Sequence, residues 1–90
     1  MEITKNEKAR RFEAAVDRGT AFLRYRIDGD TMHLLYVEVP YEARGKSVAG
    51  ELTRHVLGFA EQNGLKVVPV CSYVSSYLAR HPEYSQLIAK

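Results

Sequence analysis

The sequence is poor in the residues that would commit it to a special class of protein. Among its 90 residues there is one cysteine, Cys71, no tryptophan and only three prolines. One cysteine excludes an internal disulfide, and the three histidines lie too far apart in sequence for zinc ligands, so we expect no metal site. The apolar runs, such as Leu34–Val37, are too short to cross a bilayer, and the N-terminus lacks the pattern of a signal peptide. We therefore expect no membrane partner and a cytoplasmic location.

The charge of the chain is also nearly balanced. A formal net charge of +2 is too low to indicate nucleic-acid binding, which needs many clustered phosphate contacts. Hydrophobic residues make up 46% and charged residues 27%, which is typical of an ordinary globular domain. No repeat, low-complexity tract or linker divides the chain, so we predict a single domain over residues 1–90.

The first part of the chain has an ambiguous pattern. The segment Asn6–Val16 has high helix propensity, yet Phe12, Ala14 and Val16 alternate as they would in a strand. Propensity alone favours a helix there. In Ala21–Ile27, apolar and polar residues alternate, which predicts a half-buried strand.

A hairpin is predicted next. Asp28-Gly29-Asp30 is a hairpin signal, because Asp-Gly readily adopts the backbone angles of a tight turn. The following strand, Thr31–Val39, should pair back on its predecessor. Nearly all its residues are apolar, with His33 and Glu38 as exceptions, so we expect a central strand covered on both faces. Pro40 ends the strand because it has no N–H to donate.

The second half of the chain predicts a helix, a strand and another helix. Apolar residues at spacings of three and four run from Val48 to Ala60, and Asn63-Gly64 supplies a stop. Leu65–Val70 is an apolar strand, and a strand–helix–strand passage implies a right-handed crossover with parallel pairing. A short helix follows in Ser72–Arg80. The expected fold is α+β: an antiparallel meander, a crossover helix, a parallel strand and a C-terminal helix.

The turn Arg44-Gly45-Lys46-Ser47 lies between the predicted buried strand and the crossover helix. Unpaired N–H groups at a helix N-terminus, together with the helix dipole, attract phosphate groups. Gly45 lets an anion approach the backbone closely, and Arg44 and Lys46 add positive charge. A strand–glycine–helix turn with basic neighbours is also common as a plain structural turn, so the spacing alone leaves both interpretations open.

A longer stretch around this turn resembles a known cofactor motif. Val37-Glu38-Val39-Pro40, followed after three residues by Arg44-Gly45-Lys46-Ser47-Val48-Ala49, is similar to the acetyl-CoA-binding motif of the GNAT N-acetyltransferase superfamily. Gly45 matches one diagnostic position of that motif, whereas Glu42 and Ser47 depart from the other two. The resemblance is closer to the small single-domain GNATs (YjdJ-like) and extends from Phe12 to Tyr84, because two later stretches also match: Cys71-Ser72-Tyr73-Val74 and Arg80-His81-Pro82-Glu83-Tyr84.

The resemblance implies a fold and a cosubstrate site. It implies a strand at Arg11–Val16, against the propensity, which makes the meander three-stranded. It also implies that the strands ending at Val39 and near Val70 splay apart and expose backbone groups to the pantetheine arm of acetyl-CoA. The residues expected to bind this cosubstrate are Val37, Val39, Arg44, Gly45, Lys46, Ser47, Val48 and Ala49.

Acetyl transfer to an amine also needs a base, a donor for the developing oxyanion and a proton for the leaving thiolate. The resemblance puts Cys71 beside the acetyl group, and the start of a helix favours a thiolate, so Cys71 is a candidate catalytic residue; a small buried hydrophobe is the alternative. His33 is a weaker candidate base, expected on the strand face opposite Tyr36 if the strand is regular. The other groups near the strand ends are Tyr36, Glu38, Tyr73 and Tyr77.

The function that the resemblance implies is acetyl-CoA-dependent N-acetyl transfer. Larger GNATs wall the acceptor pocket with extra helices between their first two strands, whereas Asp17–Thr20 is only a turn here. We therefore expect an open acceptor side, which suits an amine on a protein or peptide. The alternative is a CoA-binding or protein-interaction module without turnover, favoured by the departures at Glu42 and Ser47 and by Tyr36, which stands where the small GNATs usually carry a histidine.

Overall fold

The computed structural model describes all 90 residues and contains one five-stranded sheet. Its strand order is β1-β2-β3-β4-β5, so each strand lies beside its neighbour in sequence. The first four strands pair antiparallel, and β5 joins β4 in parallel. The elements are β1 (Ile3–Asn6), β2 (Arg11–Val16), β3 (Gly19–Asp28), β4 (Thr31–Glu38), the 3-10 turn η1 (Tyr41–Ala43), α1 (Val48–Gln62), β5 (Lys66–Pro69), α2 (Ser72–Arg80) and the 3-10 segment η2 (Pro82–Leu87).

The predicted α+β order of meander, crossover helix, parallel strand and C-terminal helix is confirmed. The propensity-based helix is wrong, because β2 pairs with β1 on one side and with β3 on the other. These two ladders satisfy the backbone of β2 and bury Phe12 and Ala14, and this tertiary gain outweighs a weak local preference. β1 was not predicted from the sequence, and it makes the antiparallel meander four-stranded instead of three-stranded.

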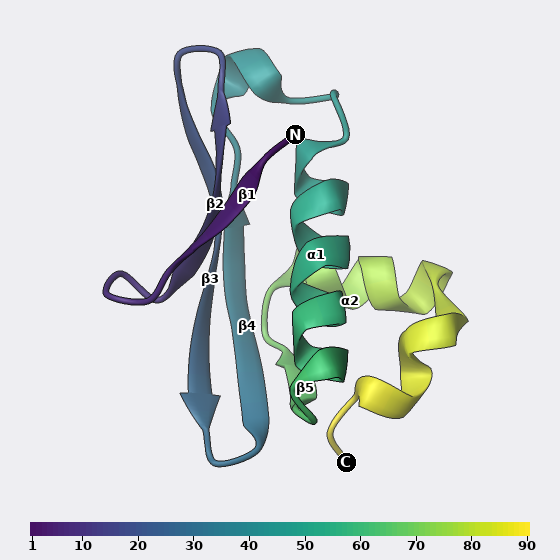
Figure 1. Cartoon of the computed structure of the whole chain (residues 1–90). Coiled ribbons are helices and arrows are strands. Elements are labelled where there is room, and N and C mark those ends of the chain that lie inside the picture. Colours follow the sequence, from purple (N-terminus) through teal and green to yellow (C-terminus); the bar gives the residue numbers. More distant parts are fainter.

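Both helices and η2 lie on the same side of the sheet, so the molecule has two layers (Figure 1). The core between the layers is one cluster of 18 buried residues. Alternate strand residues such as Phe12, Leu23 and Leu34 meet Leu52 and Val56 of α1 there. Burial of each such side chain contributes about 1.5 to 3 kcal/mol. No helix is long and apolar enough to cross a membrane.

The expectation that the strand after the hairpin is covered on both faces is wrong. Tyr36 is 42% exposed, and neither Phe22 nor Val68 packs against the core. The strands before β4 are joined by short turns, and everything after β4 packs on one side, so no element is left for the other side. We call this uncovered side the open face.

Candidate functional site

The two parallel strands separate before β4 ends. β5 pairs with β4 only from Thr31 to Leu34, and the last bond between the two segments is the Cys71 N–H donating to the Leu34 carbonyl at 3.0 Å. Pro69 closes β5, because it cannot donate to a ladder. From Leu35 to Glu38, the edge of β4 that faces β5 therefore has no strand partner, which is the splaying that the resemblance implied.

The turn into α1 leaves an unusual number of backbone donors free. Six consecutive N–H groups, from Gly45 to Gly50, donate to no acceptor in the chain, and the first bond of the helix is Glu51 N–H to the Ser47 carbonyl at 3.0 Å. The Ser47 side chain makes no capping hydrogen bond. Gly45 and Ser47 both have left-handed backbone angles, with φ of 81° and 63°, which open the turn. Such a run of donors at the positive end of a helix dipole attracts an anion.

A groove runs from this turn to the separated end of β4. It consists of two adjoining cavities of about 340 and 380 Å³, which share Val39, Arg44, Ala49 and Tyr73. We call the two together the turn groove. The remaining lining residues are Val37, Glu38, Ala43, Gly45, Ser47, Val48 and Gly50.

All but one of the residues expected at the cosubstrate site line the turn groove. The exception is Lys46, whose exposed side chain lies outside the lining. Arg44 crosses the groove: its Nε donates to the Val39 carbonyl at 3.2 Å, and its guanidinium lies 5.8 Å from the centre of the Tyr41 ring. Glu42, which departs from the family motif, is exposed and lines neither cavity.

Tyr73, on the first turn of α2, lies at the turn groove, a position that the sequence did not predict. It lines both cavities, and its hydroxyl lies close to α1, because a methyl group added at Gly50 would be 3.3 Å from it. Tyr77, by contrast, is 7% exposed and stacks on His81 with ring centres 4.0 Å apart. Burial raises the pKa of Tyr77, in keeping with its place in the core cluster.

Neither of the two named catalytic candidates lines the turn groove. Cys71 is half-buried, packs against the core and caps α2 at the point where β4 and β5 separate. His33 lies on the open face beside Arg26 of β3. The expectation that His33 and Tyr36 occupy opposite faces is wrong, because a bulge leaves Leu35 without a partner on β3 and returns Tyr36 to the open face.

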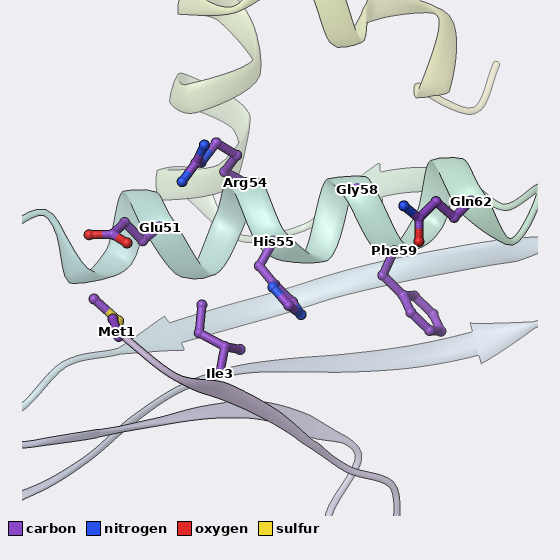
Figure 2. A pocket seen from close by; sticks show the side chains of 8 residues that line it. All are labelled: Met1, Ile3, Glu51, Arg54, His55, Gly58, Phe59 and Gln62. Atoms are coloured by element: carbon purple, nitrogen blue, oxygen red, sulfur yellow. The ribbon is translucent and has the colours of Figure 1, made fainter.

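A separate pocket of about 410 Å³ lies between α1 and β1 (Figure 2). Ile3 of β1 and the preceding Met1 lie on one side of it and His55 of α1 points toward Ile3 (Figure 2); Glu51 and Arg54 are also among the lining residues. It shares no residue with the turn groove and contains no run of free backbone donors. No group of three or more His, Cys, Asp or Glu residues gathers to hold a metal ion anywhere in the chain. The turn groove is therefore the candidate site.

Comparisons with known proteins find relatives that match nearly the whole chain. The family model described as GCN5-related N-acetyl-transferase matches residues 11–87. Protein NATD1 from Danio rerio is 27% identical over 93 residues, an alignment that covers 98% of this chain and 84% of that protein. A GCN5-like protein from Staphylococcus aureus, provisionally assigned as an N-acetyltransferase and solved by NMR, has the same fold, with a TM-score of 0.74 at 22% identity over 98% of this chain and 87% of its own.

Proposed function

This chain belongs to the family of GCN5-related N-acetyltransferases, and from that membership we propose that residues 1–90 act as one domain that transfers an acetyl group from acetyl-CoA to an amine. One observation carries the proposal. The six free N–H groups from Gly45 to Gly50 border a groove that leads to the separated ends of β4 and β5. A row of donors at a helix N-terminus suits a diphosphate, and acetyl-CoA carries one.

The proposed cosubstrate site follows the turn groove along its length. Backbone groups of Val37 on β4, and of Val39 just after β4, are open to the amides of the pantetheine arm, although the Val39 carbonyl already accepts a hydrogen bond from Arg44. The departures from the family motif do not oppose binding, because the Ser47 N–H is free and Glu42 lies outside the groove lining. The diphosphate is held by backbone N–H groups and flanking charge from Arg44, Gly45, Lys46, Ser47, Val48 and Ala49.

In the transfer step, the acceptor nitrogen attacks the thioester carbonyl, a C–N bond forms, the C–S bond breaks and the leaving thiolate takes up a proton. A lysine amine with an ordinary pKa near 10.4 must first lose its own proton, which costs about 4 to 5 kcal/mol at pH 7. Glu38 is the one carboxylate in the groove lining, so we assign it to receive this proton. Tyr73 lines the same cavity, so we assign its hydroxyl to give a proton to the leaving thiolate.

Direct transfer is the route that these positions support, because Cys71 lines neither cavity of the turn groove. A route through an acetyl-Cys71 intermediate is the competing proposal, motivated by the position of Cys71 where the strands separate. His33 contributes less to either route, since it lies where β4 is still paired with β5.

Labelled acetyl-CoA, offered with peptides that carry a lysine or a free N-terminus, tests the proposal. We expect transfer by the wild type and by Lys8→Ala, which removes one charge from the turn between β1 and β2. Arg44→Ala should be slower through a raised KM for acetyl-CoA. Binding of CoA without transfer to any amine would favour the non-catalytic module instead, and absence of both binding and transfer would overturn the proposal.

A further inference from the structure

The open face of the sheet has a charge pattern that follows from strand register. The row next to the turn groove consists of Glu13 on β2, Phe22 on β3 and Glu38 on β4. The next row consists of Arg11, Arg24 and Tyr36 on the same three strands. Side chains in register point to the same face of a sheet. An acidic row and a basic row therefore lie side by side, separated by two residues along each strand, or about 6.7 Å.

Only one charge in each row is free to meet a ligand. The Nε of Arg11 donates to Glu13, and this bond lowers the pKa of that carboxyl, so the two charges offset each other. Arg24 is exposed and makes no ion pair or hydrogen bond through its side chain, although it lies directly opposite the like charge of Arg11. Like charges opposed across strands are unfavourable. Glu38 is likewise exposed and unpaired.

Two aromatic rings form the floor between these two free charges. Phe22 and Tyr36 pack edge to face with ring centres 5.8 Å apart, and the Arg11 guanidinium lies 4.3 Å from the Phe22 ring centre. Tyr36 remains 42% exposed. This floor offers a flat contact for a chain laid along the sheet, not an enclosed pocket for a small molecule.

The open face is connected to the turn groove by Glu38. This residue pairs with Phe22 on the open face and also lines the cavity at the end of β4. Because β4 has no partner on its β5 side there, an amine held by Glu38 lies at the gap between the strands. Arg24 lies one row farther from that gap.

Resting on the function proposed above, we propose that the open face binds the acceptor as a peptide in which an acidic residue stands two positions from the acetylated lysine. In an extended peptide, side chains two residues apart point the same way and are about 6.7 Å apart, close to the roughly 7 to 8 Å expected between Glu38 and Arg24, which lie diagonally on neighbouring strands. The lysine amine goes to Glu38 and the acidic side chain to Arg24. A nucleic acid fits less well, since Glu13 and Glu38 balance Arg11 and Arg24 on this surface.

Three N-terminally blocked peptides that differ at one position, Glu-Ala-Lys, Ala-Ala-Lys and Arg-Ala-Lys in the same flanking sequence, test the proposal. The wild type should acetylate the Glu peptide with a kcat/KM about three to five times that of the Ala peptide, and the Arg peptide should be slowest. Arg24→Glu should invert this order and Arg24→Gln should flatten it. Arg26→Glu is the matched control, because it makes the same change on the same strand and face one row farther away, and it should keep the wild-type order.

A second readout does not depend on turnover. Titration of the Glu-Ala-Lys peptide into labelled protein should shift the amide resonances of Phe22, Arg24 and Tyr36, and Arg24→Glu should abolish the shifts. If no peptide is acetylated while these shifts occur, the binding surface stands and the proposed function fails. If peptides are acetylated without regard to charge, or Arg24→Glu leaves their order unchanged, the surface proposal fails and the proposed function stands. Binding of single-stranded DNA, or a dimer that Arg24→Glu dissociates, would likewise overturn the peptide assignment.

Discussion

Replacing Ser47 by glycine should stabilise the protein and leave the cosubstrate site intact. Ser47 precedes α1 with a φ of 63°, in the left-handed region that a side chain makes unfavourable. That conformation costs roughly 1 to 2 kcal/mol for an ordinary residue. Glycine avoids this cost but returns about 0.5 to 1 kcal/mol through its greater freedom in the unfolded chain. We therefore expect a net gain of about 0.5 to 1 kcal/mol.

For a chain of this size, such a gain should raise Tm by about 2 to 8 °C. Ser47→Ala is the matched control: it keeps the side-chain carbon and the backbone cost, and removes only the hydroxyl. A serine that caps a helix through its side chain usually contributes about 1 kcal/mol, but Ser47 makes no such bond. The alanine variant should therefore stay within about 0.5 kcal/mol of the wild type. Both values follow from urea unfolding monitored by circular dichroism.

Binding of CoA to the two variants should change little, because every backbone N–H group of the turn is kept. Isothermal titration should give Kd values within about twofold of the wild type, or lower for the glycine variant, whose turn lets a phosphate approach more closely. If Ser47→Ala lost affinity strongly while folded, the hydroxyl would be a cosubstrate contact. If Ser47→Gly were destabilising, the backbone argument would be refuted.

Arg44→Ala should weaken CoA binding by about threefold to tenfold at low salt. The difference in Kd between Arg44→Ala and Lys8→Ala should shrink as the salt concentration is raised, because salt screens the charge. A difference in Kd that salt does not alter would indicate that Arg44 acts through packing instead of charge. The hydrogen bond from Arg11 lowers the pKa of Glu13 below its ordinary 4.5, so the stability it provides is present above that pH and is lost as pH falls through the lowered pKa. Glu13→Gln should remove this part of the acid sensitivity of unfolding, and an unchanged pH profile would contradict the assignment. Intact-mass analysis after incubation with acetyl-CoA alone should show no acetyl adduct on Cys71, and Cys71→Ala should retain most of the turnover; an adduct whose loss abolishes turnover would establish the covalent route.

The elements with long periodic patterns could be predicted from the sequence. Each of β3, β4 and α1 is buried on one side. Burial on one side produces a periodic pattern of apolar residues in the sequence, and that pattern can be recognised. β1 has no such pattern, because its four residues, Ile3–Asn6, contain a single apolar side chain. β1 forms because the edge of β2 that faces away from β3 has backbone groups free to pair with it.

The details of the candidate site could be predicted only in part. The turn from Arg44 to Ala49 was visible because glycine and basic residues stand between two strong periodic elements. The bulge at Leu35 was not, because an extra residue is apparent only when β4 is aligned with β3, and it reversed the expected relation between His33 and Tyr36. The position of Tyr73 in the groove lining could not be predicted either, because it depends on the angle at which α2 meets α1, and local sequence does not encode that angle.

The amide spectrum of ¹⁵N-labelled protein titrated with CoA tests the central claim most directly. CoA should shift the resonances of all six residues from Gly45 to Gly50, whose N–H groups are free in the structure, and pantetheine, which lacks the diphosphate, should not. His55 and Phe59, which line the separate pocket beside β1, serve as internal controls and should stay in place. Saturable CoA binding that moves His55 and Phe59 while the six turn amides remain unshifted would contradict the assignment of the cosubstrate site.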